Sequence, residues 1–260
     1  MDDLRLAFDL ADIADQISLD RFKANDLVIT QKPDLTPVSD ADQKIEQLIR
    51  AHLLLVSPQD GVIGEEFENK TSANNREWIL DPIDGTKNYI RGVPIWATLI
   101  ALRESEEIIC TVVSAPAINR RWYASKGSGA YVSENILGKE KTRKLQVSGV
   151  SKISDASFAF AEVVRAGHWE SNYDAFLQLT NDVWRSRGFG DFWAHMLVAE
   201  GAVDFTIEPK LALWDMAALY LIVKEAGGAF TNLAGVDGVS GPGAISSNGK
   251  LQELLITRFN

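Results

Sequence analysis

The stretch from Trp78 to Thr86 constrains this 260-residue chain more than any other. It reads Trp-Ile-Leu-Asp-Pro-Ile-Asp-Gly-Thr, so an apolar run typical of a buried strand ends on two carboxylates, Asp81 and Asp84. Pro82 fixes its own φ and stiffens the backbone between the acids. Two carboxylates and the carbonyl of Ile83 are oxygen ligands of the kind that Mg²⁺ prefers. The alternative is a capping turn with incidental acids, because Asp-Pro and Asp-Gly are common turn dipeptides.

The residues after this strand, Asp84, Gly85 and Thr86, indicate the start of a helix. The first N–H groups of a helix have no intrahelical partner and can bind a phosphate, and Gly85 lets an anion approach closely. Two further acidic motifs favour a binding site over a simple turn. Gly64-Glu65-Glu66 ends another short apolar strand, and Trp214-Asp215 opens a helix in the other half of the chain.

Helices and strands alternate along the chain, which is typical of a layered α/β (α+β) fold. Leu6, Leu10 and Ile13 recur at helical spacing, and Ser39 is expected to cap a second helix that ends near residue 56, with Asp42 in a capping-box position. Further helices are expected near 173–179, 191–200 and 214–226, and strands near 62–64, 78–80, 95–103, 107–115, 121–125, 158–163 and 203–207. The polar segment 138–156 is the best boundary between two halves, residues 1–150 and 151–260.

The net charge of −10 argues against a nucleic-acid-binding protein whose affinity comes from neutralising phosphates. The one basic run, Lys139–Lys144, is short and interrupted by an acid, and we expect it to form a solvated loop. An acidic protein that handles an anionic phosphate must screen the repulsion. Bound divalent cations would do so.

Membrane and secreted proteins are disfavoured by three observations. The apolar stretches are too short to cross a bilayer. The chain begins Met1-Asp2-Asp3, which is acidic where a secretory signal is basic. The single cysteine, Cys110, cannot form an internal disulfide and is expected to be buried filler. We therefore expect a cytoplasmic protein with no membrane partner.

Several motifs together resemble the signatures of the inositol monophosphatase superfamily. They are Gly64-Glu65-Glu66, the stretch Trp78–Thr86, Trp214-Asp215-Met216-Ala217-Ala218, and Glu225-Ala226-Gly227-Gly228. Their order and spacing also fit, and the resemblance covers nearly the whole chain. It implies a layered αβαβα sandwich of the inositol monophosphatase and fructose bisphosphatase kind. It further implies a Mg²⁺-dependent phosphomonoesterase, with two or three ions between the two halves and a homodimeric assembly.

The resemblance also implies roles for individual residues. The family's metal ligands match Glu65, Asp81, the carbonyl of Ile83, Asp84 and Asp215. Thr86 matches the threonine that, with Glu65, orients the attacking water. Asp42 matches an acid that supports this threonine, although a simple helix N-terminal charge remains an alternative. Because no cysteine, serine or histidine lies in a recognisable nucleophile motif, direct attack by water is favoured over a phosphoenzyme.

Two segments, Asp84–Thr98 and Arg187–Trp193, resemble the histidinol-phosphatase branch of the family. Inositol-specific members carry a small hydroxyl residue where this chain has Asp191. Histidinol bears an ammonium and an imidazole, so Asp191 could pair with a cation while aromatic rings stack beside it. Glu208 matches a family residue that touches the leaving alcohol and is a second anionic contact.

Three of the proposed substrate contacts, Asp191, Phe192 and Arg187, have a structural alternative. Asp191 could cap the helix that follows it. Phe192 could belong to the core or to a dimer interface, and Arg187, which matches a position near the mouth of the site, could form a local salt bridge. His195 and His168 lack the spacing of metal ligands and are expected to be structural or surface residues.

The sequence therefore predicts an enzyme that hydrolyses L-histidinol phosphate to L-histidinol and phosphate, a step of histidine biosynthesis. The alternative is an inositol-1-phosphatase or a broad sugar-phosphate phosphatase. A more remote alternative is a non-catalytic binding or scaffold protein with the same fold. The intact set of acidic ligands argues against the last, because a scaffold has no need of metal ions.

Overall fold

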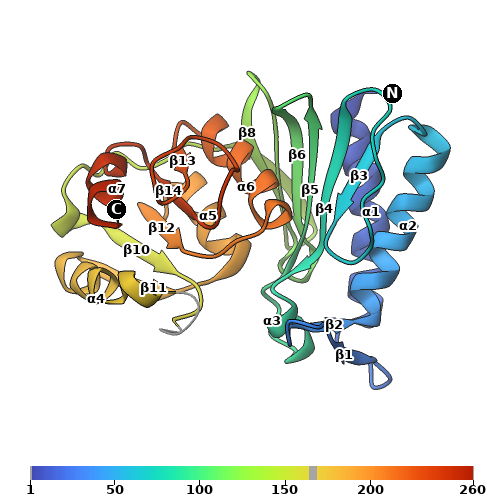
Figure 1. The fold of residues 1–260 in the computed structure, drawn as a ribbon, viewed down its shortest axis with the longest axis horizontal. Helices are drawn as coiled ribbons and strands as arrows, with labels where there is room; N and C mark the ends of the chain where they lie inside the picture. Colours follow the sequence, from blue (N-terminus) through green and yellow to red (C-terminus); the bar gives the residue numbers. More distant parts are fainter. Residues whose placement is uncertain (1, 164–168, 260) are drawn as a thin grey trace.

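Layers of helix and sheet alternate across the molecule (Figure 1). The computed structural model describes residues 2–163 and 169–259, so His168 lies outside the described part. From one side to the other, the layers are a helix pair, a large sheet, a second helix pair, a smaller sheet and an outer helix pair. This is the αβαβα sandwich that the family resemblance predicted.

The large sheet comes from the first part of the chain. Within the described residues it has seven strands in chain order; β3 runs parallel to β4, and each later strand is antiparallel to the one before it. The strands are β3 (Gly61–Gly64), β4 (Arg76–Asp84), β5 (Ala97–Glu104), β6 (Glu107–Ala115), β7 (Arg120–Ser125), β8 (Gly129–Ile136) and β9 (Lys139–Lys144). A small hairpin of β1 (Ile29–Gln31) and β2 (Pro37–Ser39) precedes them.

Helices α1 (Asp3–Arg21) and α2 (Asp40–Val56) cover one face of this sheet (Figure 1). The carboxylate of Asp42 accepts a hydrogen bond from the backbone N–H of Ser39 at 2.8 Å, as the predicted capping box requires. Leu10 and Ile45 are fully buried against the sheet. Cys110 is buried in the same cluster, which confirms its structural role.

The smaller sheet comes from the second part of the chain and mixes parallel and antiparallel pairs. Its order is β11-β10-β12-β14-β13, with β10 (Ser157–Phe160), β11 (Arg185–Gly188), β12 (Phe205–Glu208), β13 (Ala229–Thr231) and β14 (Ala244–Ser247). Between the sheets lie α5 (Asp191–Ala199) and α6 (Leu213–Glu225), and on the outer face lie α4 (Tyr173–Asp182) and α7 (Gln252–Phe259). α6 packs on both sheets and joins the two halves through one core.

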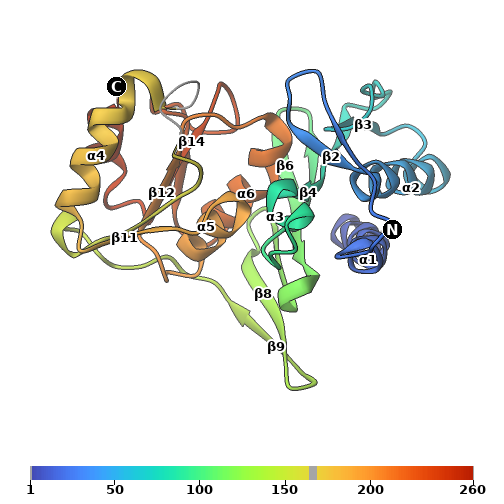
Figure 2. The same ribbon diagram turned by 90° about the horizontal axis from the view of Figure 1, so that it is seen from below.

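The basic run Lys139–Lys144 is a strand, β9, and the prediction of a solvated loop there was wrong. Leu137 and Gly138 both have positive φ and turn the chain back on β8 in a two-residue hairpin. The hairpin projects from the body of the molecule (Figure 2). Lysines on an edge strand discourage pairing with other chains, so this composition fits a solvent-exposed edge.

Among the residues described, every helix is too short or too polar to cross a bilayer.

Candidate active site

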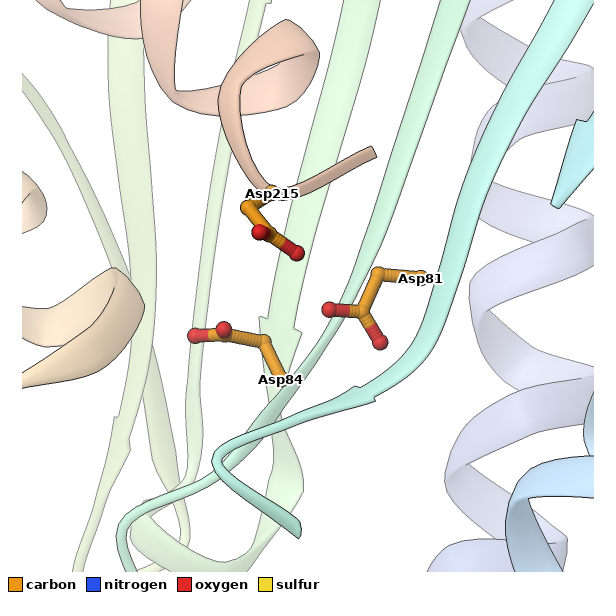
Figure 3. Close-up of side chains that lie close together, drawn as sticks. All are labelled: Asp81, Asp84 and Asp215. Carbon is orange, nitrogen blue, oxygen red and sulfur yellow. The ribbon is translucent and has the colours of Figure 1, made fainter. Parts of the chain in front are cut away.

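Three carboxylates from distant parts of the chain meet between the two halves (Figure 3). Asp81 and Asp84 lie at the end of β4, and Asp215 lies in the first turn of α6. One oxygen of each carboxylate lies within 4.8 Å of the others. Because α6 packs across β4 and β5, the core itself brings Asp215 to the end of β4.

A bulge in β4 turns Asp81 and Asp84 toward the same site. Residues three apart on a regular strand point to opposite faces. Here the pairing with β5 shifts register, since Asp81 pairs with Leu99 whereas Asp84 pairs with Ala97. An extra residue of this kind bends a strand and re-aims its side chains. The strand therefore continues to Asp84, whereas the sequence predicted that it ends at residue 80.

The electrostatics of the cluster favour a bound cation. Burial, followed by repulsion from neighbouring acids, raises the pKa of Asp81 and of Asp84 well above the usual range. The pKa of Asp215 rises to about 7, chiefly through burial. Several buried carboxylates that repel one another are stable in ionised form once a divalent ion neutralises them. The all-oxygen donor set fits Mg²⁺.

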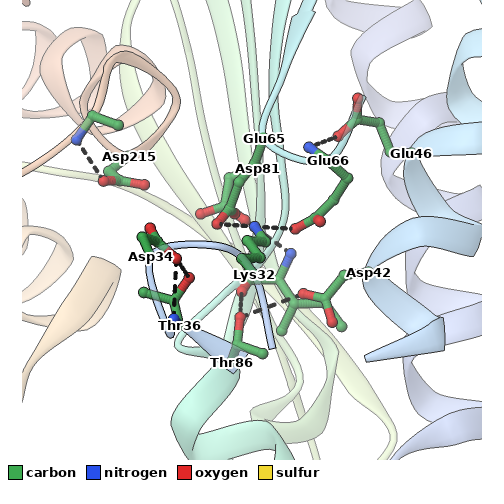
Figure 4. A network of polar contacts seen from close by, with 12 residues as sticks. Lys32, Asp34, Thr36, Asp42, Glu46, Glu65, Glu66, Asp81, Thr86 and Asp215 are labelled. Atoms are coloured by element: carbon green, nitrogen blue, oxygen red, sulfur yellow. Dashed lines mark hydrogen bonds and ion pairs between the residues drawn. The ribbon is translucent and has the colours of Figure 1, made fainter. Parts of the chain in front are cut away.

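Glu65 lies at the other side of this cluster and is held by Lys32 (Figure 4). The Nζ atom of Lys32 lies 2.7 Å from a carboxylate oxygen of Glu65 and 2.7 Å from one of Glu66. Burial opposes the charge on Lys32, but the hydrogen bonds to the two glutamates outweigh it and raise the pKa of the ammonium. No sequence motif indicates a role for Lys32, since it lies in the turn between β1 and β2, far along the chain from the acidic motifs.

Thr86 connects the end of β4 to α2. Its hydroxyl lies 2.9 Å from the carbonyl oxygen of Ile83 and 3.4 Å from a carboxylate oxygen of Asp42. The other carboxylate oxygen of Asp42 accepts the capping bond from Ser39, so Asp42 contacts both Thr86 and the start of α2. Burial raises the pKa of Asp42 to about 6.

Gly85 stands at the start of the short helix α3 (Thr86–Ile90), as the sequence predicted. Its φ of 86° is in the left-handed region, which favours glycine. A Cβ atom at Gly85 would lie 3.2 Å from a carboxylate oxygen of Asp191. Gly85 therefore lets α3 and the start of α5 approach closely.

A cavity of about 460 Å³ opens beside the acidic cluster. Its lining also includes Asp191, in the first turn of α5 and close to Gly85, and Glu208, at the end of β12. Burial and then repulsion from Glu208 raise the pKa of Asp191 to about 7. Its carboxylate accepts a hydrogen bond from the side-chain amide of Asn88 at 3.1 Å and makes no side-chain cap of α5.

Comparison with known proteins agrees with this geometry. The model of the inositol monophosphatase family matches residues 2–260. The chain belongs to the inositol monophosphatase family. A histidinol-phosphatase of Streptomyces coelicolor is 51% identical, with 100% of this chain and 97% of the relative covered, and one of Mycobacterium tuberculosis is 48% identical, with 100% and 98% covered. The solved structure of an IMPase of Thermotoga maritima superposes with a TM-score of 0.87 at 26% identity, covering 100% of this chain and 97% of that one.

Within this inositol monophosphatase fold, Phe192 borders the cavity, whereas Arg187 lies outside its lining. The ring of Phe192 is fully buried and packs on Trp122, while its backbone N–H donates to Asp84 at 2.6 Å. The exposed guanidinium of Arg187 donates to the carbonyl of Ser186.

Besides Phe192, the aromatic residues that line the cavity are Phe160, Trp169 and Phe189. Phe160 ends β10, so the rule that sites gather at strand ends could have identified it. Trp169 carries no such signal, since its position depends on packing against Phe176.

Proposed function

We propose that this chain hydrolyses L-histidinol phosphate to L-histidinol and inorganic phosphate with the help of Mg²⁺. The chain belongs to the inositol monophosphatase family and is similar to histidinol-phosphatases. It is therefore a phosphoric monoester hydrolase that acts on a small phosphate ester. The observation that carries the choice of substrate is the pair of acids, Asp191 and Glu208, in the same cavity as the metal-binding carboxylates.

Glu65, Asp81, Asp84, Asp215 and the carbonyl of Ile83 would hold the ions, two or three in number. When bound, these ions supply an activated water and neutralise charge on the phosphoryl oxygens and the leaving group. One oxygen of Asp215 accepts the backbone N–H of Ala212 at 2.7 Å, and one oxygen of Asp84 accepts that of Phe192. These bonds fix both carboxylates and leave an oxygen of each for an ion.

Thr86 and Glu65 orient the attacking water in this proposal. The hydroxyl proton of Thr86 is engaged by the carbonyl of Ile83, with Asp42 close by, so the Thr86 oxygen remains to accept a hydrogen bond from the water. The carboxylate of Glu65 is a base for the other proton. The reaction forms a P–O bond to the water oxygen as Glu65 takes a proton from it, and it breaks the P–O bond to the alcohol, whose oxygen takes up a proton from solvent water.

Two groups of cavity residues divide the substrate between them. The phosphate meets the backbone of Gly85 and Thr86 beside Asp84, where the first N–H groups of α3 lie. The ammonium and imidazole of histidinol extend toward Asp191 and Glu208, which attract a cation and would be left unpaired by inositol. Phe189 and Phe160 add aromatic faces beside them.

Three further expectations rest on the resemblance to the family. They are a homodimeric assembly, a cytoplasmic location and a place in histidine biosynthesis. The division into halves near residue 150 likewise remains a proposal, since α6 of the second half packs on the sheet of the first.

The test is phosphate release from L-histidinol phosphate and from inositol 1-phosphate at matched concentrations, with Mg²⁺ and with a chelator. We expect release that requires Mg²⁺ and a kcat/KM at least about tenfold higher for L-histidinol phosphate, since a hydrogen bond to a charged group contributes about 1.5–3 kcal/mol. Equal or reversed preference would overturn the substrate, and release in the presence of chelator would overturn the metal requirement.

A further inference from the structure

A buried chain of three polar side chains lies behind the cavity wall that carries Glu208. His195 of α5 is fully buried, as are Ser246 of β14 and most of Glu208 of β12. The Nδ1 atom of His195 lies 2.6 Å from the hydroxyl oxygen of Ser246, and its Nε2 atom lies 3.1 Å from a carboxylate oxygen of Glu208. A structural histidine was expected here, but its link to Glu208 connects it to the proposed substrate contacts.

We propose that His195 is a positioning residue for substrate choice: it holds the carboxylate of Glu208 where the cationic part of the leaving alcohol binds. This inference rests on the proposed function. His195 lines no part of the cavity and acts through Glu208.

The partners of the ring fix the direction of each hydrogen bond. An ionised carboxylate only accepts, so Nε2 carries a hydrogen and donates to Glu208. In a neutral imidazole the other nitrogen then accepts, and the hydroxyl of Ser246 donates to Nδ1. Each of the three groups is satisfied in this arrangement, and the ring orients the carboxylate of Glu208 through one hydrogen bond.

Three elements hold this chain in place. β12 and β14 pair in register, with Thr206 opposite Ser246 and Glu208 opposite Ala244. α5 carries both residues: Asp191 begins the helix with a φ of 49°, and His195 lies one turn later, buried in the core. The helix therefore carries one proposed contact itself and supports the other through the imidazole ring.

The free oxygen of Glu208 is the one available to a substrate. Within residues 2–163 and 169–259, the hydrogen bonds of the Glu208 side chain are confined to Oε1, which faces His195. A glutamate that is already held in one rotamer loses less side-chain entropy when a ligand binds. Loss of the His195 bond should therefore weaken binding of a cationic substrate more than it slows the chemical step.

The experiment compares four variants with the wild-type enzyme in Mg²⁺, measuring kcat and KM for L-histidinol phosphate and for the neutral ester glycerol 2-phosphate. His195→Phe removes both bonds at similar volume. His195→Gln keeps a donor and an acceptor on one side chain. Ser246→Ala removes the partner of Nδ1. Thr206→Val is the matched control, because its buried hydroxyl lies opposite Ser246 and has no hydrogen-bond partner within the described residues.

For His195→Phe we expect the KM for L-histidinol phosphate to rise about tenfold and the kcat to change by less than about threefold, as for loss of a bond to a charged group. His195→Gln should restore most of the KM, Ser246→Ala should raise it about two- to fivefold, and Thr206→Val should match the wild type. The selectivity ratio against glycerol 2-phosphate should fall in step with the rise in KM.

An unchanged KM in folded His195→Phe would overturn the inference, as would equal losses on both esters. If His195→Phe fails to fold by circular dichroism, Ser246→Ala decides alone, and a wild-type KM in that variant overturns the inference. A wild-type enzyme with no preference for L-histidinol phosphate would instead overturn the proposed function, and the inference with it.

Discussion

Two groups of acids in the cavity, the proposed metal ligands and the proposed substrate contacts, are built in different ways. Among the proposed metal ligands, Asp81 and Asp84 come from one continuous stretch, and Pro82 and the bulge of β4 set their directions locally. The proposed substrate contacts, Asp191 and Glu208, come from a helix and a strand whose relation depends on the packing of the smaller sheet. Local chain geometry thus orients two of the proposed ligands, whereas tertiary assembly places the third, Asp215, and both proposed substrate contacts.

The largest expected effect comes from replacing a proposed metal ligand. Asp215→Asn should lower kcat/KM by more than about 100-fold, because even residues that merely support metal ligands cost 10- to 100-fold when they are mutated. The far-UV circular dichroism spectrum should match that of the wild type. Asp155→Asn, on the exposed surface, is the control and should retain full activity. Near-normal turnover in Asp215→Asn would remove this carboxylate from the mechanism.

The second prediction concerns pH and Mg²⁺. The pKa of Asp42 is raised from 3.8 to about 6, and that of Asp215 from 3.8 to about 7. An acid whose pKa is raised by folding contributes stability below its unfolded pKa and loses that contribution as pH rises through its folded pKa. The free energy of unfolding of the metal-free protein should therefore fall as the pH rises from about 4 to about 7.

Binding of Mg²⁺ should reverse this loss. At 100 times the Kd, a ligand adds about 2.7 kcal/mol, which raises the Tm of a domain this size by roughly 5–10 °C. We expect a larger rise at pH 7.5 than at pH 5, where protons compete for the same carboxylates. Differential scanning calorimetry with and without Mg²⁺ measures it. An equal rise at both pH values would contradict the assignment of these acids as ligands.

A smaller effect should come from Gly64, the residue before Glu65. A Cβ atom there would overlap the carboxylate of Glu46, which is fully buried and held by the backbone N–H of Glu66 at 2.8 Å. Gly64→Ala should therefore lower the free energy of unfolding by about 1–3 kcal/mol, the usual cost of overpacking. Gly149→Ala is the control in urea denaturation, since its nearest neighbour would be the Nζ atom of Lys250 at 3.8 Å. Equal stability of the two variants would show that the site is not tightly packed.

The same contrast explains how much the sequence could predict. Helical periodicity and the capping motif at Ser39 and Asp42 predicted the long helices, because such signals lie within a few residues. β11, β13 and β14 have three or four residues each and carry too little periodicity to be recognised. β9 was taken for a loop because charge indicates exposure but does not separate an edge strand from a turn.

The candidate site follows the same rule. The acids proposed as metal ligands lie in short motifs, and the structure brings Asp81, Asp84 and Asp215 together. Two contacts could not be predicted from the sequence. Lys32 lies 33 residues from its partner Glu65, and His195 lies 51 residues from its partner Ser246. Sequence spacing alone holds no record of such contacts.

The most direct test of this division is the kcat/KM of wild-type enzyme and Glu208→Gln for L-histidinol phosphate and for glycerol 2-phosphate, with Glu253→Gln on the exposed face of α7 as the control. We predict that the ratio of the two kcat/KM values falls by about 10- to 100-fold in Glu208→Gln, since a charged contact of about 1.5–3 kcal/mol is lost for one substrate alone, and stays at the wild-type value in Glu253→Gln. An unchanged ratio, with both esters affected equally, would contradict the claim that Glu208 helps to select the substrate.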